Sequence, residues 1–581
     1  MRIEARSGDK IVFNHVLGTV KRGNFRLRWR GLKTGGPYTI TLSLTDNSGT
    51  TVATYSCKDV RVGDVWLLGG QSNMQGCGLR AGAAKAHPQV RAFYMDDRWA
   101  VARDPLHNLW AAVDPVHPKL NGGVRGSPNT TTGVGPGVAF GQAMHSITGV
   151  PQGLIACAHG GTSMSQWDPS LQDQGGNSLY GAMLRRLEIN GGRVAGMIWY
   201  QGESDANQPA HDHYTSRMVA LVKAVRKAAG DTRLPIAMVQ LGRVTNWPST
   251  IQGGAPWNSV QEQQRQLPGM IKHLAVVPAV DLELDDPIHI SGTAQQILGQ
   301  RLAGAMALLK GNKKAPPLPQ FDRITLVANP ERPEFGAVRL SFKSIIGKLT
   351  AIGRPQGFFM LSGQGVMMHY ATRIEKDAVL LLTAQPLSLI KGYRVGHGLT
   401  TDPYCNVGDQ GGRPLPVFGP LELMHNRAMT PFARSWRVAR LESAFSTLRR
   451  QPRWPKQDWA LEAPDDFANL REDIEKQPVG TYLLRACFTL SEPMRIQALL
   501  GYDGPVAAWL DDQLVYRDIN GTNPAWMDQG EGKPLLLKPG KHTITIALGT
   551  QDGNAWGVFL RLTRKAKSPS KKSAPALPAW C

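Results

Sequence analysis

The sequence has few cysteines, few charged residues and no long apolar segment. Its six cysteines among 581 residues form no Cys-x-x-Cys pair and lack the histidine spacing of zinc sites, so they neither demand nor exclude a disulfide. No run of about 18 apolar residues occurs, which excludes a typical membrane-spanning helix. The first residues, MRIEARSGDKIVFNHV, carry charges where a signal peptide needs an apolar stretch. We therefore expect a soluble chain, with no signal peptide in this sequence.

Composition indicates a folded protein with many turns. Only 19% of the residues are charged and 42% are hydrophobic, which excludes a globally disordered chain. The 63 glycines and 40 prolines favour short strands over long helical bundles. Lys and Arg outnumber Asp and Glu by 66 to 45, but no basic helix, zinc finger or RNA-binding aromatic motif accompanies them. We therefore expect no nucleic-acid partner.

Hydrophobic patterning divides the chain into several parts. Alternating strand-like runs at both ends, such as Asn24–Trp29 and Tyr482–Leu490, predict β modules. A stiff Pro-Pro-Leu-Pro linker at 316–319 separates the middle from the second half. We predict an N-terminal β module (1–60), a catalytic α/β domain (61–312) with a long loop insertion (79–135), a β-rich domain (320–430), a β-sandwich or jelly-roll domain (432–563) and a disordered basic tail (564–581).

Between residues 61 and 312, apolar runs of strand length alternate with helical stretches. In Ala210–Ala229, apolar residues recur at three- and four-residue steps, and Thr293–Leu309 begins with a Thr-x-x-Gln capping box at Thr293 and Gln296. The predicted strands are Val65–Leu68, Gly153–Ala158, Val194–Tyr200, Leu234–Leu241 and Leu274–Val280. This alternation predicts the α/β class, with a parallel sheet and helices on both faces.

Ser72 is a candidate nucleophile. It follows the apolar run Val65–Leu68 and the pair Gly69-Gly70, which places it at the carboxyl edge of the predicted parallel sheet, where α/β folds bind ligands. A serine needs a base to take its proton and donors to hold the oxyanion. Asp286 lies three residues before His289, a spacing that lets a carboxylate orient an imidazole base. Asp281 and Asp285 are rival carboxylates, and this acidic segment could instead hold a hard cation.

Two loops offer oxyanion donors. Ala158-His159-Gly160-Gly161-Thr162 follows one predicted strand and supplies unhindered backbone N–H groups. Trp199-Tyr200-Gln201-Gly202-Glu203-Ser204 follows another strand and supplies a side-chain amide.

Four motifs occur in order: GQSNM at 70–74, GGTSMSQW at 160–167, WYQGES at 199–204 and DPIH at 286–289. Together they resemble the sialate O-acetylesterase family, a carbohydrate-esterase branch of the SGNH (GDSL) hydrolases, over roughly residues 20–425. The resemblance implies a flavodoxin-like sheet and a periplasmic or secreted location. It also implies a serine esterase that removes O-acetyl groups from sialic acid or plant-type polysaccharides through an acyl-enzyme. Neither a metal nor a cofactor is expected.

The resemblance also implies a role for each site residue. Ser72 would attack the acetyl carbonyl, His289 would take the serine proton and return it to the departing sugar oxygen, and Asp286 would orient His289. The backbone N–H groups of Ser72 and Gly161 and the side chain of Gln201 would bind the oxyanion. The candidates for substrate binding or structural support are Gln71, Asn73, Trp167 and Glu203.

An alternative function is a carbohydrate-binding or adhesion protein with a vestigial esterase site. Tryptophans of the last β domain could stack on sugar rings, although such residues belong more often to the core. These are Trp454, Trp459, Trp509, Trp526 and Trp556. A lipase or protease of the α/β-hydrolase type is not supported, because no Gly-x-Ser-x-Gly elbow is present.

Overall fold

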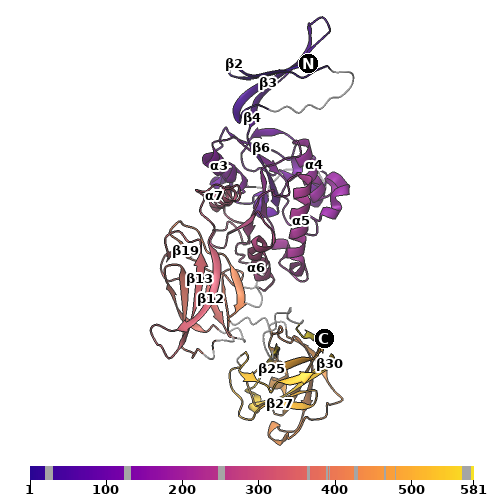
Figure 1. Cartoon of the computed structure of the whole chain (residues 1–581), viewed down its shortest axis with the longest axis vertical. Helices are drawn as coiled ribbons and strands as arrows, with labels where there is room; N and C mark the ends of the chain where they lie inside the picture. Colours follow the sequence, from indigo (N-terminus) through magenta and orange to yellow (C-terminus); the bar gives the residue numbers. More distant parts are fainter. Residues whose placement is uncertain are drawn as a thin grey trace.

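The computed structural model describes the chain apart from residues 20–30, 123–132, 247–254, 363–366, 388–389, 391–392, 424–428, 464–465, 478, 526 and 566–576. Four parts follow one another along the chain: an antiparallel sheet, an α/β part and two further β parts (Figure 1). Among the described residues, no helix has both the length and the apolar character needed to cross a lipid bilayer.

The α/β part is built on a seven-stranded sheet with the order β11-β10-β9-β5-β8-β6-β7. Its strands are β5 (Asp64–Gly70), β6 (Val90–Phe93), β7 (Trp99–Val101), β8 (Gln152–Ala156), β9 (Gly196–Tyr200), β10 (Ile236–Gln240) and β11 (Leu274–Pro278). All neighbours pair in parallel except β6 and β7. Strands β8, β5, β9, β10 and β11 follow the flavodoxin order 2-1-3-4-5, in which ligands bind beside the first strand. The predicted parallel sheet is confirmed.

The segment 79–135 is more than the predicted loop insertion. It supplies β6 and β7, which extend the sheet beyond β8, and the short helix α2 (Val116–Leu120). The prediction was wrong here because β6 has only four residues, too few for a periodic pattern to stand out among the surrounding glycines and prolines.

Helices cover both faces of the sheet, with α3 and α7 on one side and α4 and α5 on the other (Figure 1). Their bounds are α3 (Gly137–Thr148), α4 (Leu179–Ile189), α5 (Tyr214–Ala228), α6 (Ala255–Met270) and α7 (Gly292–Leu309). The apolar residues spaced along α5 are buried, as its pattern predicts. The predicted capping box of α7 is wrong: Ser291 is the N-cap and accepts a hydrogen bond from the Ala294 N–H at 3.1 Å, while Gln296 donates to the Gly82 carbonyl.

The N-terminal part is one antiparallel sheet with the order β2-β1-β3-β4. Its strands are β1 (Arg2–Ser7), β2 (Lys10–Val16), β3 (Gly35–Thr45) and β4 (Thr51–Val62), and its small core centres on Ile3 and Ile40. The strand expected over Asn24–Trp29 lies outside the described residues.

The third part consists of three small antiparallel sheets around one core. Its strands are β12 (Gln320–Ala328), β13 (Gly336–Lys343), β14 (Leu349–Ala351), β15 (Phe358–Leu361), β16 (His369–Ile374), β17 (Ala378–Thr383), β18 (Arg394–His397), β19 (Val407–Asp409) and β20 (Phe418–Glu422). It docks on the α/β part through Gln240 at the end of β10, whose side-chain amide exchanges hydrogen bonds of 2.8 and 2.9 Å with the backbone of Val417.

The last part contains two antiparallel sheets that share a core. One sheet holds β21 (Ser435–Leu441), β22 (Trp459–Glu462), β24 (Thr481–Leu490), β26 (Val506–Leu510), β27 (Gln513–Asp518), β30 (Gly540–Gly549) and β32 (Ala579–Trp580). The other holds β23 (Ala468–Asn469), β25 (Met494–Tyr502), β28 (Gly530–Glu531), β29 (Leu535–Leu537) and β31 (Gly557–Arg564), and α8 (Arg471–Lys476) follows β23. The β architecture is confirmed, and the jelly-roll connection stays a prediction.

The tail predicted to be disordered over 564–581 has an ordered segment at 577–581. Ala579–Trp580 form β32 against β24, and the Trp580 indole N–H donates to the Pro431 carbonyl at 2.8 Å. The prediction failed there because one aromatic side chain found a partner, Phe488, in a segment that is otherwise poor in apolar residues.

Candidate active site

Ser72 lies at the carboxyl end of β5, at the start of the short helix α1 (Ser72–Gln75). The two glycines before it are required by close packing. A Cβ on Gly70 would lie 2.0 Å from the carbonyl oxygen of Tyr200, and Gly70 has a φ of +133°. A Cβ on Gly69 would lie 2.9 Å from the ring of Trp199. The Gly69-Gly70 pair therefore lets β5 approach β9 closely just before the serine.

Ser72 and His289 line the same cavity, whose volume is about 510 Å³. Gly160, Gly161 and Glu203 line it as well. The cavity lies at the carboxyl ends of β5, β8 and β9, where the strand order places a ligand site. Residues from all four motifs thus line one opening.

Asp286 holds the ring of His289. Its Oδ2 lies 2.6 Å from His289 Nδ1, and its Oδ1 accepts the backbone N–H groups of Ile288 and His289 at 2.9 and 2.8 Å. Burial acts to raise the pKa of Asp286, but these hydrogen bonds outweigh burial and hold its pKa below the ordinary value. An ionised carboxylate on Nδ1 fixes the tautomer in which Nε2 carries no proton.

The rival carboxylates have other partners. Asp281 pairs with Arg301 at 2.6 Å, and Asp285 accepts the backbone N–H groups of Leu79 and Gly292 at 2.7 and 2.8 Å. In the described part of the chain, no three His, Cys, Asp or Glu side chains gather in a metal-binding arrangement. Of the three aspartates, Asp286 is the one on His289.

Asn73 links the turn at 71–75, called the serine turn, to the loop at 286–290, called the histidine loop. Its Nδ2 donates to Glu203 at 2.8 Å and to the Ile288 carbonyl at 3.3 Å, and its Oδ1 accepts the Ile290 N–H at 2.9 Å. These bonds reach the residues on both sides of His289. Asn73 therefore acts on the relative placement of Ser72 and His289, rather than on a ligand.

Glu203 lies behind this contact, at the cavity wall. One of its carboxylate oxygens accepts from Asn73, and the other is buried with no hydrogen-bond partner among the described residues. Burial raises the pKa of Glu203, with the Asn73 hydrogen bond acting in the opposite direction. Its contact with Asn73 joins the loop of Glu203 to the turn that carries Ser72, and the supporting role of Glu203 stays a prediction.

Gln71 and Gln75 join the serine turn to the two neighbouring loops. Gln71 Oε1 accepts the N–H groups of Gly202 and Ser204, each at 3.3 Å. Gln75 Oε1 accepts the Gly160 N–H at 2.6 Å, next to the predicted oxyanion donor Gly161. Gln75 is not among the predicted site residues, because it stands one residue after the GQSNM motif, one turn of helix after Ser72.

A buried histidine pair supports the same loop. His159, immediately before Gly160, has its Nδ1 2.9 Å from His117 Nδ1, and the two rings stack. Burial lowers the pKa of His159 to about 4 and holds the pKa of His117 well below its ordinary value. The pair is therefore neutral near pH 7, with one ring donating to the other.

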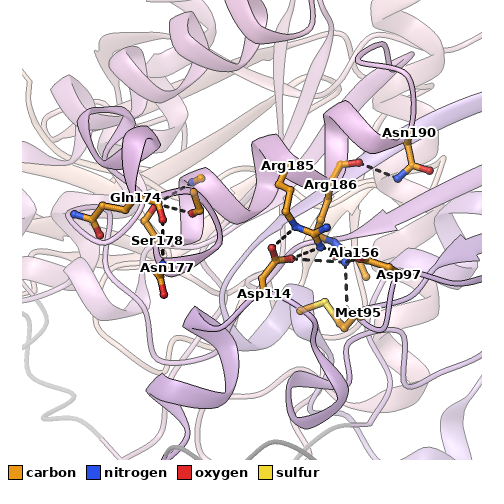
Figure 2. A network of polar contacts seen from close by, with 12 residues as sticks. Met95, Asp97, Asp114, Ala156, Gln174, Asn177, Ser178, Arg185, Arg186 and Asn190 are labelled. Atoms are coloured by element: carbon orange, nitrogen blue, oxygen red, sulfur yellow. Dashed lines mark hydrogen bonds and ion pairs between the residues drawn. The ribbon is translucent and has the colours of Figure 1, made fainter. Parts of the chain in front are cut away.

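Two arginines of α4 fix the strand ends beneath this loop (Figure 2). The guanidinium of the fully buried Arg186 donates to the Ala156 carbonyl at the end of β8, at 2.9 Å, and pairs with Asp97 at 2.8 Å. Arg185 reaches both Asp97 and the buried Asp114, the latter at 3.0 Å through Oδ2. The network joins α4 to the segment from which the 158–162 loop emerges.

Gln201 does not take the predicted position on the cavity wall. Its side chain is fully buried, and its Nε2 donates to the Thr162 carbonyl at 3.1 Å and to Asp205 Oδ2 at 2.6 Å. Both amide hydrogens are thus engaged in joining its own loop to the 158–162 loop. The oxyanion role of Gln201 stays a prediction, and this geometry favours the backbone donors over it.

Trp167 is a packing residue. It is fully buried, its indole N–H donates to Thr162 Oγ1 at 3.0 Å, and its ring meets that of Trp199 edge to face at 5.2 Å. It does not line the cavity, which favours the supporting role over direct substrate binding.

The third part of the chain supports the histidine loop from outside. The Val244 N–H donates to the Thr401 carbonyl at 2.7 Å, and the N–H of the next residue, Thr245, donates to the Pro287 carbonyl at 2.8 Å. Pro287 lies between Asp286 and His289, so these hydrogen bonds link the third part of the chain to the predicted base, His289.

The chain is similar to known carbohydrate esterases. A family model described as "Carbohydrate esterase, sialic acid-specific acetylesterase" matches residues 62–308. The chain is 31% identical over 268 residues to a probable carbohydrate esterase of Arabidopsis thaliana. This match covers 42% of this chain and 89% of the plant protein. It is 27% identical over 342 residues to sialate O-acetylesterase of Homo sapiens, covering 51% of this chain but only 63% of the human protein.

Among solved structures, a carbohydrate acetylesterase from Xanthomonas citri is similar in fold. The TM-score is 0.52 at 23% identity, and the match covers 72% of this chain and 92% of the other. The resemblance predicted from the four motifs is confirmed by the family model and the plant relative. The chain therefore belongs to the sialic acid-specific acetylesterase family of carbohydrate esterases.

Proposed function

We propose that the protein is a serine esterase that hydrolyses O-acetyl esters of carbohydrates through an acyl-enzyme. One observation carries the proposal: Ser72 and His289 line one cavity, and the Asp286 carboxylate lies 2.6 Å from Nδ1 of that histidine. This is the arrangement that activates a serine hydroxyl.

In the proposed reaction, Nε2 of His289 takes the proton from Ser72 as the hydroxyl oxygen attacks the acetyl carbonyl. The backbone N–H groups of Ser72 and Gly161 bind the oxyanion. The imidazolium returns its proton to the departing sugar oxygen, which leaves an acetyl group on Ser72. Water, deprotonated by His289, then releases acetate and restores the serine.

The acetylated substrate is proposed as a sialic acid, which the family model and the human relative name, or as a plant-type polysaccharide, the alternative implied by the motif resemblance. The open cavity of about 510 Å³ supports a ligand of sugar size. A sugar-binding protein with a vestigial site is not favoured, because the serine and histidine line one cavity and the aspartate is hydrogen-bonded to the histidine. Of the tryptophans that suggested it, Trp509 is buried in the core and Trp526 lies outside the described residues.

Acetate release by Ser72→Ala tests the proposal. With p-nitrophenyl acetate, wild type should release a burst of p-nitrophenolate equal to the enzyme concentration when deacylation limits turnover, because acetate leaves only in the second step. The variant should lose at least about 10³-fold in kcat. Ser165→Ala, at an exposed position on a neighbouring loop, is the matched control and should remain active. Near-normal hydrolysis by Ser72→Ala would contradict the mechanism, and a panel of acetylated xylan, pectin and sialic acids would rank the substrates.

A further inference from the structure

The segment at 577–581 completes an open sheet edge in the last part of the chain. Strand β30 pairs with β24 along the whole of Thr481–Leu490 on one side. On the other side β21 reaches only from Thr481 to Arg485, and β32 covers Phe488 and Thr489 beyond it. An uncovered stretch of β24 would offer unpaired backbone groups to other chains, so this segment protects the edge.

The register of this pairing sets two cysteines opposite each other. Phe488 pairs with Trp580 and Thr489 with Ala579 in antiparallel order, so the next pair is Cys487 with Cys581. The Cys581 N–H donates to the Cys487 carbonyl at 2.9 Å, which shows that the pairing continues to this position. Opposed residues on antiparallel strands have Cα atoms about 4.5–5.5 Å apart and side chains on one face. This range lies within the distances that a disulfide spans.

The two cysteines differ in exposure. Both cysteines are thiols in the structure, with Cys581 exposed and Cys487 half-buried. Burial and a hydrogen bond with the Cys487 thiol raise the pKa of Cys581, while the charge of Lys541 on β30 acts to lower it. The pairing register therefore places the two thiols side by side, and Cys581 is the one accessible to an oxidant.

We propose that Cys487 and Cys581 form a disulfide that fastens residues 577–581 to β24. The oxidant is a disulfide, either a small molecule such as oxidised glutathione or a thiol–disulfide oxidoreductase. The exposed Cys581, as its thiolate, attacks one sulfur of the oxidant and releases the first thiol. The Cys487 thiolate then attacks the mixed disulfide, forms the new S–S bond and releases the second thiol. The two cysteines lose two protons and two electrons, and the oxidant gains them.

Mass spectrometry of the full chain tests the bond itself. After incubation with oxidised glutathione, alkylation under denaturing, non-reducing conditions and digestion, the peptides of Cys487 and Cys581 should be linked, and a reductant should separate them. Cys57→Ser, which removes an exposed thiol of the N-terminal sheet, is the control and should form the same link, whereas Cys581→Ser should not. Alkylation of both cysteines, or their recovery only as mixed disulfides with glutathione, would overturn the proposal.

Thermal unfolding tests the fastening. A disulfide limits the unfolded chain most when it closes a long loop, so the oxidised wild type should melt roughly 5–10 °C above the reduced protein. The difference should be absent in Cys581→Ser and present in Cys57→Ser. Equal melting temperatures for the linked and reduced wild type would overturn the fastening role.

Discussion

Replacing Asp286 with Asn tests how the proposed base is held. In the wild type, one carboxylate oxygen accepts two backbone N–H groups while the other accepts from His289 Nδ1. An amide has a single oxygen. If that oxygen stays with the backbone donors, the new NH₂ group faces Nδ1, which must then become an acceptor. The imidazole proton moves to Nε2, and Nε2 can no longer take the serine proton.

The expected cost follows from these contacts. A hydrogen bond to a charged group contributes about 1.5–3 kcal/mol, and the wrong tautomer adds to its loss. We expect kcat to fall about 10³–10⁴-fold, equivalent to about 4–5.5 kcal/mol at 1.36 kcal/mol per factor of ten. KM should change little, because Asp286 holds His289 and does not line the cavity.

Initial rates of acetate release over a range of substrate concentrations separate kcat from KM. Asp281→Asn is the matched control: it neutralises a carboxylate of the same segment that pairs with Arg301, and kcat should stay within about threefold. The reasoning is refuted if Asp286→Asn keeps more than about a tenth of the wild-type kcat while remaining folded by circular dichroism.

Three further predictions follow from the surroundings of the site. Asn73→Ala should lower kcat about 10- to 100-fold at similar KM, because it frees the histidine loop, and unchanged kcat in the same acetate assay would contradict this role. Trp167→Ala should reduce the free energy of unfolding by about 3–5 kcal/mol in urea titrations, whereas a loss below about 1 kcal/mol would mean that this fully buried ring packs poorly. Burial keeps the folded-state pKa of His159 at about 4, below the roughly 6.5 of unfolded histidine, so the unfolded chain takes up more protons between these values. The contribution of His159 to the free energy of unfolding is complete above pH 6.5 and falls on acidification, by on the order of 3 kcal/mol at pH 4. Urea titrations of wild type and His159→Asn over this pH range measure it. Equal pH dependence of the two free energies of unfolding would contradict the prediction.

The central sheet could be predicted because its strands are buried on both faces and therefore read as continuous apolar runs. β9 and β10 are buried throughout, and the helices between them carry one apolar face. Strands β6 and β7 escaped prediction because they have only four and three residues, and those of the edge strand β7 are largely exposed, so neither shows a periodic pattern. The ordered segment at 577–581 escaped it for another reason: its order depends on an open edge of β24, some 90 residues away along the chain.

Within the site, local pairs were predictable and distant ones were not. The three-residue spacing of Asp286 and His289 is short enough to fix their contact by itself. The direction of the Gln201 amide depends on Asp205 and on a carbonyl of a different loop, neither of which a motif reveals. Arg186 looks like a surface residue of an amphipathic helix, but it is buried because the carbonyls at the ends of β6 and β8 require donors.

The path from Thr401 through Val244 and Thr245 to Pro287 has a consequence for dissecting the protein. A shortened version that stops at the proline-rich linker near 316–319 would keep all three residues of the proposed triad, yet remove the carbonyl that anchors Val244. The excised fragment would keep the hydrogen bond from Thr245 to Pro287 but lose the contact that holds the neighbouring Val244. One support of the histidine segment therefore comes from a later stretch of the gene product, and an expression boundary that follows the family match at 62–308 would remove it.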